Sequence, residues 1–286
     1  MFHDARPSHH FLQHLKTSQG AEQMAEPFYV SGATGYDAMF AHVTAAFIPA
    51  LFDAAQIASG HRVLDVATGT GAAAQAAANV VGPTGEVVAG DISPTMLEVA
   101  RRSPEKAGIT FEQIDGHNLP YVDARFDRVI CQLGLAFFDD PARGLAEFLR
   151  VLVPGGRTAV IVNSTPERSL FTRIGSVIGK YVPEKAEQLN RYASIRTPER
   201  LRALLVGAGF GDVDVNSVTR PFSFETFDHY FAGTEAGAAS SGQEFVKLTS
   251  ALRQTVREEV RRSFPEEGLR KPFVVETEVL LGSGTK

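Results

Sequence analysis

Short apolar runs alternate with helical patterns through the first half of the chain. Apolar runs bounded by turn residues indicate buried strands, whereas apolar residues at helical spacing indicate amphipathic helices. On this basis strands are expected at 62–67, 86–90, 109–113, 126–132 and 157–163, and helices at 72–80, 94–103 and 141–152. Strands that alternate with helices in this way predict a mostly parallel sheet covered on both faces, and therefore an α/β fold.

The alternation stops after Ser164, and the flanking regions follow other patterns. Residues 35–58 have helical spacing, and Pro49 is expected to break them into two helices. Further expected elements are a helix at 198–208, a strand at 212–218, a helix at 244–264 and a last strand at 273–281. We expect one domain over residues 28–286, preceded by a flexible arm at 1–27. Two insertions, about 165–195 and 222–266, should form a helical lid.

Composition narrows the class of protein. The 286 residues are 44% hydrophobic and carry a net charge of −5, which disfavours a general nucleic-acid partner. The single cysteine, Cys131, excludes an intramolecular disulfide and fits a cytoplasmic protein. No apolar run reaches the length of ~18 residues that a membrane span needs, and the polar N-terminus lacks a signal-peptide core. No metal site is expected, because the N-terminal histidines lack ligand spacing.

The segment VLDVATGTG at residues 63–71 is the strongest candidate for a ligand site. A strand there runs into a glycine turn that opens a small-residue helix. Glycines let the backbone approach a ligand, and the start of a helix offers free N–H groups. In an open α/β sheet, ligands bind beside the carboxyl ends of the strands. The loop spacing also matches a dinucleotide pattern, so the glycines alone leave NAD and S-adenosylmethionine (SAM) both open.

Three acidic residues favour SAM. Asp65 precedes the glycines, where it suits the loop and a cationic methionine end better than a pyrophosphate. Asp91, at the end of the second strand, can take both ribose hydroxyls. Asp115, at the end of the third strand, can accept from the adenine amino group, with Gly116 and His117 framing the ring. Carboxylates would repel a pyrophosphate, whereas SAM carries no phosphate.

The chain resembles class I SAM-dependent methyltransferases, most closely their ubiquinone/menaquinone-biosynthesis-like branch. The resemblance is carried by Tyr36-Asp37-x-Met39, VLDVATGTG, VGPTGEVVAGDISPTMLEVAR, FDRVICQLGLAFFDDPARGLAEFLRVLVPGGR and ERLRALLVGAGFGDVDV. It implies a Rossmann-like, seven-stranded, mostly parallel sheet whose last strand is antiparallel, with N-terminal helices and lid insertions. The chain departs from the family where an aromatic residue commonly follows the fifth strand, because Asn163-Ser164 stands there.

The same resemblance implies roles for individual positions. The glycine loop would line the methionine and ribose, Asp91 would bind the ribose, and Gln132 would contact the methionine amino group through its backbone. The implied cofactor set comprises Tyr36, Asp65, Ala67, Thr68, Gly69, Gly71, Asp91, Ile92, Met96, Asp115, Gly116, His117, Gln132 and Leu133. Ile92 and Met96 would pack on the adenine, while Leu133 and Phe137 would border the acceptor.

The lid insertions are rich in apolar and aromatic residues, which predicts an apolar or aromatic small-molecule acceptor. The expected acceptor-site residues are Phe137, Phe171, Tyr181, Phe227 and Tyr230. No base motif is evident, so the catalytic residues stay unassigned and O-, N- and C-methylation are all open. Two rival functions remain: an NAD(P)-dependent oxidoreductase, and a SAM-binding protein of this fold that transfers no methyl group. A homodimer is the assembly to test.

Overall fold

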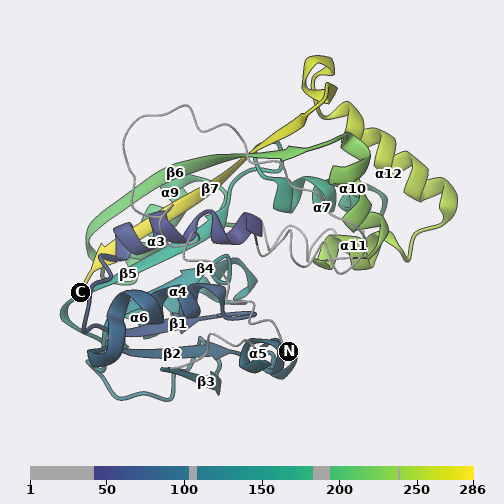
Figure 1. Ribbon diagram of the computed structural model, residues 1–286. Coiled ribbons are helices and arrows are strands. Elements are labelled where there is room, and N and C mark those ends of the chain that lie inside the picture. Colours follow the sequence, from purple (N-terminus) through teal and green to yellow (C-terminus); the bar gives the residue numbers. More distant parts are fainter. Residues whose placement is uncertain (1–41, 103–107, 183–193, 238) are drawn as a thin grey trace, which may run out of the picture.

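The computed structural model describes residues 42–102, 108–182, 194–237 and 239–286, and within them it contains a seven-stranded sheet (Figure 1). The strand order is β3-β2-β1-β4-β5-β7-β6. The strands are β1 Arg62–Val66, β2 Glu86–Asp91, β3 Ile109–Gln113, β4 Phe126–Gln132, β5 Leu152–Asn163, β6 Gly211–Phe224 and β7 Phe273–Thr285. β7 runs antiparallel to both β5 and β6. All pairs formed among the first five strands are parallel. The expected Rossmann-like α/β sheet is confirmed.

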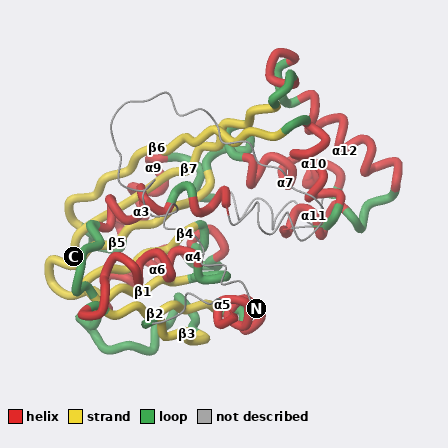
Figure 2. The backbone as a smooth tube through the Cα atoms, viewed as in Figure 1, coloured by secondary structure: helices red, strands yellow, loops and turns green. Residues whose placement is uncertain are grey.

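Helices cover both faces of this sheet. The helices are α3 Ile48–Ala55, α4 Ala72–Val81, α5 Pro94–Arg102, α6 Pro141–Val151, α7 Leu170–Tyr181, α9 Pro198–Gly207, α10 Phe227–Glu235, α11 Ala239–Phe245 and α12 Ser250–Arg262, with short 3-10 turns η2 Gly82–Thr84, η3 Leu135–Phe137 and η4 Glu266–Leu269. One apolar core joins α3 and α4 to the sheet, and a second joins α6 and α9 to its opposite face. Figure 2 shows this layering.

Local sequence signals set several helix starts. Asp140 accepts from the N–H of Arg143 ahead of α6, and Thr197 accepts from the N–H of Arg200 ahead of α9. In both helices a proline follows the cap, where its missing N–H costs no hydrogen bond. Pro49 lies in the first turn of α3 and separates it from the helical residues before it, as expected. The expected flexible arm at 1–27 lies outside the described residues.

The last two strands are longer than the sequence pattern predicted. β6 was expected at 212–218, but its pairing with β7 continues to Phe224, opposite Phe273. The aromatic residues Phe222 and Phe224 therefore end a strand, and they do not begin an insertion at 222 as expected. The two long strands project past the end of β5. The lid helices α7, α10, α11 and α12 lie around this projecting part of the sheet (Figure 1). The expected helix at 244–264 is shorter in the structure: α11 ends at Phe245, and Thr249 caps the new start of α12 at Ser250.

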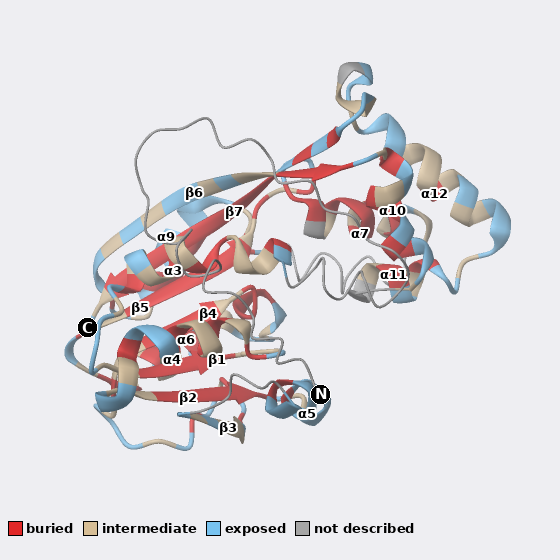
Figure 3. Ribbon diagram, in the orientation of Figure 1, coloured by how far each residue is buried: buried red, intermediate tan, exposed pale blue. Residues whose placement is uncertain are grey.

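The lid has an aromatic core of its own, here called the lid core and defined by Phe224, Phe227, Tyr230, Phe264 and Phe273. Their rings lie 5.1–6.3 Å apart, centroid to centroid. Phe227 and Tyr230 are only 4% and 2% exposed. That these two side chains line the acceptor site stays a prediction, and their burial favours packing inside the lid. Each packs against the other rings of the lid core, which predicts a structural role. Figure 3 shows the buried stripe that runs from the sheet into the lid.

Candidate cofactor site at the carboxyl edge of the sheet

The register of the parallel strands brings the predicted residues to one edge. Val66 pairs with Gly90 and Asp91 pairs with Gln113, while Asp65 pairs with Ile130 on the other side of β1. The loop after β1, the end of β2 and the end of β4 therefore lie level with one another. Only parallel pairing does this, because it places the carboxyl ends of all three strands on the same side.

The glycine loop folds into a tight turn with left-handed backbone. Ala67, Gly69 and Gly71 have φ values of 57°, 57° and 86°. The N–H of Gly71 donates to the carbonyl of Thr68 at 2.9 Å, which closes the turn. Gly71 then precedes α4 and, having no side chain, caps none of the first N–H groups of this helix. Glycine adopts this backbone without cost, whereas Ala67 holds it against its own preference.

Asp91 holds the glycine loop against the end of β2. Its Oδ2 accepts from the N–H of Gly69 and its Oδ1 accepts from the N–H of Ser93, both at 2.8 Å. The side chain is largely buried, with 8% of the residue exposed. Hydrogen bonds from backbone N–H groups to a carboxylate are among the stronger ones in proteins. The sequence predicted a ribose contact for Asp91, and the structure adds that this carboxylate also shapes the loop.

Asp65 is a buried carboxyl behind the same loop. The residue is 1% exposed, and its Oδ2 accepts from the hydroxyl of Thr68 at 2.6 Å. Its Oδ1 has no hydrogen-bond partner among the described residues. Burial raises the pKa of Asp65 to about 7; the Thr68 bond and the N–H of Ala74 oppose this shift, and the charge of Asp91 adds to it. An acid in this state would gain from a cationic group nearby, which fits the methionine end of SAM.

The raised pKa of Asp65 predicts how stability depends on pH. The native carboxyl holds its proton up to about pH 7, whereas the unfolded one loses it near pH 4. The native state then binds more protons between these values, so its stability falls as the pH rises through this window. We expect the ligand-free chain to lose about 2.5 kcal/mol relative to Asp65→Asn between pH 5 and pH 8. Urea unfolding of both proteins at each pH measures this difference, and parallel slopes would contradict the prediction.

The expected adenine side of the edge is open and partly apolar. Ile92 is 66% exposed and Met96 is 46% exposed, so both can cover a flat ring. Asp115 is exposed and bonds to His117, whose N–H and ring lower the pKa of the Asp115 carboxyl. At Gly116 a Cβ atom would lie 2.2 Å from the ring of Phe138, so only glycine fits this turn. Asp115 is thus held as an anion that can accept a hydrogen bond.

The geometry of the loop fits SAM better than a dinucleotide. In a dinucleotide site the loop N–H groups and the start of the helix face a pyrophosphate. Here the N–H of Gly69 already donates to the Asp91 carboxylate, with the Asp65 carboxyl buried behind it. A pyrophosphate would meet two acids where it needs donors. A cationic, phosphate-free cofactor meets no such conflict.

The end of β4 closes the site from the other side. The side chain of Gln132 donates to the carbonyl of Thr44 at 2.7 Å and so ties the N-terminal helical segment to the sheet edge. Leu133 has a φ of 60°, and its N–H donates to Ile161. A Cβ atom on Gly134 would lie 2.3 Å from that of Ala67, so the two loops touch. The predicted backbone contact of Gln132 with the cofactor stays a prediction.

Sequence analysis did not single out Ser93, Gly134 or Thr44. Gly134 had a usable signal, because a glycine after a strand end indicates a close backbone approach. Ser93 had a weaker one, since a serine directly before Pro94 is typical of a helix cap. Thr44 had none, because the side chain that contacts it comes from a residue far along the chain.

The residues predicted to line the acceptor site lie in different surroundings. Phe137, in η3, is 57% exposed, an open surface unusual for a phenylalanine. The hydroxyl of Tyr181 donates to Glu259 and joins α7 to α12. Tyr36 lies outside the described residues, as does the side chain of Phe171. Among the acceptor-site candidates whose side chains the structure describes, Phe137 is the one that is largely exposed.

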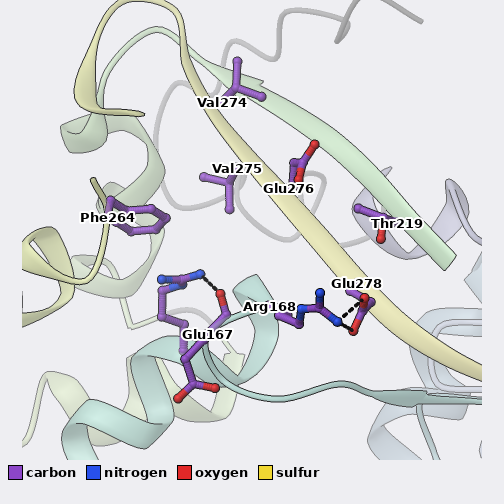
Figure 4. A pocket seen from close by; sticks show the side chains of 9 residues that line it. Glu167, Arg168, Thr219, Phe264, Val274, Val275, Glu276 and Glu278 are labelled. Carbon is purple, nitrogen blue, oxygen red and sulfur yellow. Dashed lines mark hydrogen bonds and ion pairs between the residues drawn. The ribbon is translucent and has the colours of Figure 1, made fainter. Parts of the chain in front are cut away.

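A separate cavity of about 210 Å³ lies between β7 and the loop before α7. Figure 4 shows Glu167, Arg168, Glu276 and Glu278 around it, with Arg168 paired to Glu278. Glu278 also accepts from the hydroxyl of Ser164, which follows the last residue of β5. None of the predicted cofactor residues that the structure describes lines this cavity.

The chain is similar in sequence to several known proteins. A family profile described as "Methyltransferase domain" matches residues 63–156. The ubiquinone/menaquinone biosynthesis C-methyltransferase UbiE of Pseudomonas paraeruginosa is 36% identical over 76% of this chain and 92% of its own length. The UbiE protein of Pseudomonas fluorescens is 35% identical over the same shares.

Solved structures share the fold. A Bacillus halodurans protein, described as a presumed methyltransferase, is 25% identical and has a TM-score of 0.60 over 84% of this chain and 99% of that one. The [4+2]-cyclase SpnF has a TM-score of 0.53 at 20% identity, over 84% of this chain and 80% of that one. The second likeness concerns the fold alone.

Proposed function

Because this chain belongs to the class I SAM-dependent methyltransferases, in the branch that contains the UbiE C-methyltransferases, we propose that it transfers the methyl group of SAM to a ring carbon of a small aromatic acceptor. The choice of SAM as the cofactor rests on Asp91. Its carboxylate accepts from the N–H of Gly69, which a dinucleotide site would leave free for the pyrophosphate. The carbon acceptor is supported by the UbiE relatives, which are named as C-methyltransferases. The exposed ring of Phe137 supports an aromatic partner.

The residues of the edge would hold SAM at both ends. Asp65 and the glycine loop would bind its methionine end, and Asp91 its ribose. Ile92, Met96 and Asp115 would bind the adenine. When bound, SAM supplies an electrophilic methyl group on a positively charged sulfur. The protein then has to orient the acceptor in line with that methyl group and to exclude water. The loop of Leu133 and Gly134, packed against Ala67, lies where it can do both.

The reaction balances without an oxidant. The ring carbon forms the new C–CH₃ bond, the S–CH₃ bond breaks, and S-adenosylhomocysteine leaves. The ring carbon then releases its proton and recovers aromaticity. An electron-rich ring, such as a hydroquinone, is a sufficient nucleophile, so a strong protein base is not required. This fits the lack of a recognisable base motif in the sequence.

An assay with a labelled methyl group tests this proposal. SAM carrying a ¹³C methyl group is incubated with the chain and a short-chain prenylated 1,4-naphthohydroquinone that has a free ring position. We expect S-adenosylhomocysteine and product in equal amounts, with the ¹³C signal in the range of a methyl group on an aromatic carbon. A signal in the methoxy or N-methyl range would disprove carbon transfer.

The rival without methyl transfer has its own readout. The SpnF likeness shows that this fold also occurs in a cyclase. If SAM binds but no acceptor in a panel of hydroquinones, phenols and amines yields S-adenosylhomocysteine, the methyl-transfer proposal fails. A thermal shift with NADH and none with SAM would instead favour the oxidoreductase.

A further inference from the structure

The imidazole ring of His117 makes two hydrogen bonds at the adenine side of the site, one as donor and one as acceptor. Its ring Nδ1 lies 2.8 Å from Oδ1 of Asp115, and its Nε2 lies 3.3 Å from the backbone nitrogen of Asp140. The backbone N–H of His117 also donates to Oδ1 of Asp115, at 2.9 Å. The imidazole therefore bridges the loop after β3 and the N-cap of α6.

The Asp140 contact decides which ring nitrogen carries the proton. A backbone N–H can only donate, so Nε2 must accept and be unprotonated. A neutral imidazole then has its proton on Nδ1, and that proton points to the Asp115 carboxylate. The ring is further held by Phe138, 4.8 Å away between centroids, and by the side chain of Arg143, which donates to the His117 carbonyl. The tautomer and the orientation of the ring are thus both set by the protein.

This arrangement uses one carboxylate oxygen of Asp115 for hydrogen bonds and leaves the second oxygen open to a ligand. Oδ1 accepts both bonds from His117, whereas Oδ2 accepts no hydrogen bond from the described residues. The side chain of Asp115 is half exposed, so Oδ2 can meet a ligand at the edge of the sheet. A carboxylate oxygen accepts only, and it therefore distinguishes a 6-amino purine, which donates, from a 6-oxo purine, which accepts.

From this geometry we infer that His117 is a positioning residue that holds Oδ2 of Asp115 for the 6-amino group of the cofactor's purine. It gives the site its preference for an adenosyl over an inosyl cofactor. The inference rests on the proposed placement of the adenine beside Asp115. His117 does not itself contact the reacting atoms.

Ligand affinity, measured by calorimetry on the full chain, tests this role. The probes are S-adenosylhomocysteine and S-inosylhomocysteine, which differ at the purine 6-position and at N1, where the inosyl base carries a proton. We expect the wild type to bind the adenosyl compound at least about tenfold more tightly, because the inosyl oxygen would face a carboxylate. In His117→Ala the adenosyl affinity should fall about five- to tenfold while the inosyl affinity stays within about twofold.

A matched variant and a double mutant separate positioning from a general structural role. His117→Asn places an amide N–H near the position of Nδ1, so it should keep the preference although the bond to Asp140 is lost. In an Asp115→Ala background, His117→Ala should change neither affinity further. A His117→Ala protein that keeps the preference, or that weakens both ligands equally, overturns the inference. The same holds for a His117→Asn protein that loses the preference. Failure of the proposed cofactor would look different, because the wild type would then bind neither probe.

Discussion

Replacing Asp91 by asparagine should weaken S-adenosylhomocysteine binding by at least about 100-fold. Its two carboxylate oxygens accept from the N–H groups of Gly69 and Ser93. An amide has one oxygen, so one of these N–H groups would face an NH₂ group instead. Hydrogen bonds to a charged group contribute about 1.5–3 kcal/mol each, and about 1.4 kcal/mol corresponds to a tenfold change in affinity. The loss of one loop bond together with the ribose contact gives the expected factor. Calorimetric titration of the full chain measures it.

The chain offers a matched control for Asp91. Asp127 also accepts from a backbone N–H, that of Arg62, at 2.8 Å, and it pairs with the Arg62 side chain. Arg62 is the first residue of β1, so this acid lies at the opposite end of the strand from the glycine loop. Asp127→Asn should lower stability but leave ligand affinity within about twofold. Equal losses of affinity in both variants would show that the effect of Asp91 is a general loss of structure.

The second large effect is expected in the lid core. Phe227→Ala should lower the free energy of unfolding by about 3–5 kcal/mol, the usual cost of removing a fully buried phenylalanine side chain. Phe227 lies 5.6–6.3 Å from the rings of Tyr230, Phe231, Phe264 and Phe273, and the guanidinium of Arg257 stacks on it. Removal leaves a cavity with several aromatic walls, which cannot collapse without moving two helices and a strand. Urea unfolding gives the change directly.

Phe137→Ala is the comparison for Phe227→Ala. Both variants delete the same side chain, but Phe137 is 57% exposed and Phe227 is 4% exposed. Phe137→Ala should therefore change stability by no more than about 0.5 kcal/mol. If Phe137 borders the acceptor, the same variant should raise the acceptor KM in the methyl-transfer assay. A small stability loss for Phe227→Ala, together with a raised KM, would support the prediction that Phe227 lines the acceptor site and contradict its structural role in the lid core.

Short-range patterns were sufficient for the parallel half of the fold. The strand–helix alternation from residue 62 to residue 163 predicted β1 to β5 and the helices between them, because each element carries its own periodicity and its own stop signals. The position of the cofactor edge followed, since parallel strands place their carboxyl ends together. The acids Asp65, Asp91 and Asp115 could be selected for the same reason, each lying in or just after one of these strands.

The lid depended on long-range pairing and was predicted less well. Phe222 and Phe224 alternate in a way that fits either a strand end or a loop, and only their pairing with β7 decides between the two. Phe227 and Tyr230 have a helical, aromatic pattern that fits a binding wall or a core equally well. Their partners Phe264 and Phe273 come from distant parts of the chain, so burial could not be inferred locally.

The sequence by itself thus determined the α/β class, the glycine loop and the acids that favour SAM, because a strand end and the residues after it form one local unit. Only the tertiary structure decided how these residues act on one another. Asp91 fixes the loop by accepting from the N–H of Gly69, which follows a different strand. Burial by the surrounding elements raises the pKa of Asp65, and the N-cap residue of α6 sets the tautomer of His117. Hydrogen-bond partners and burial depend on which segments meet in space, and periodicity along the chain carries no record of that.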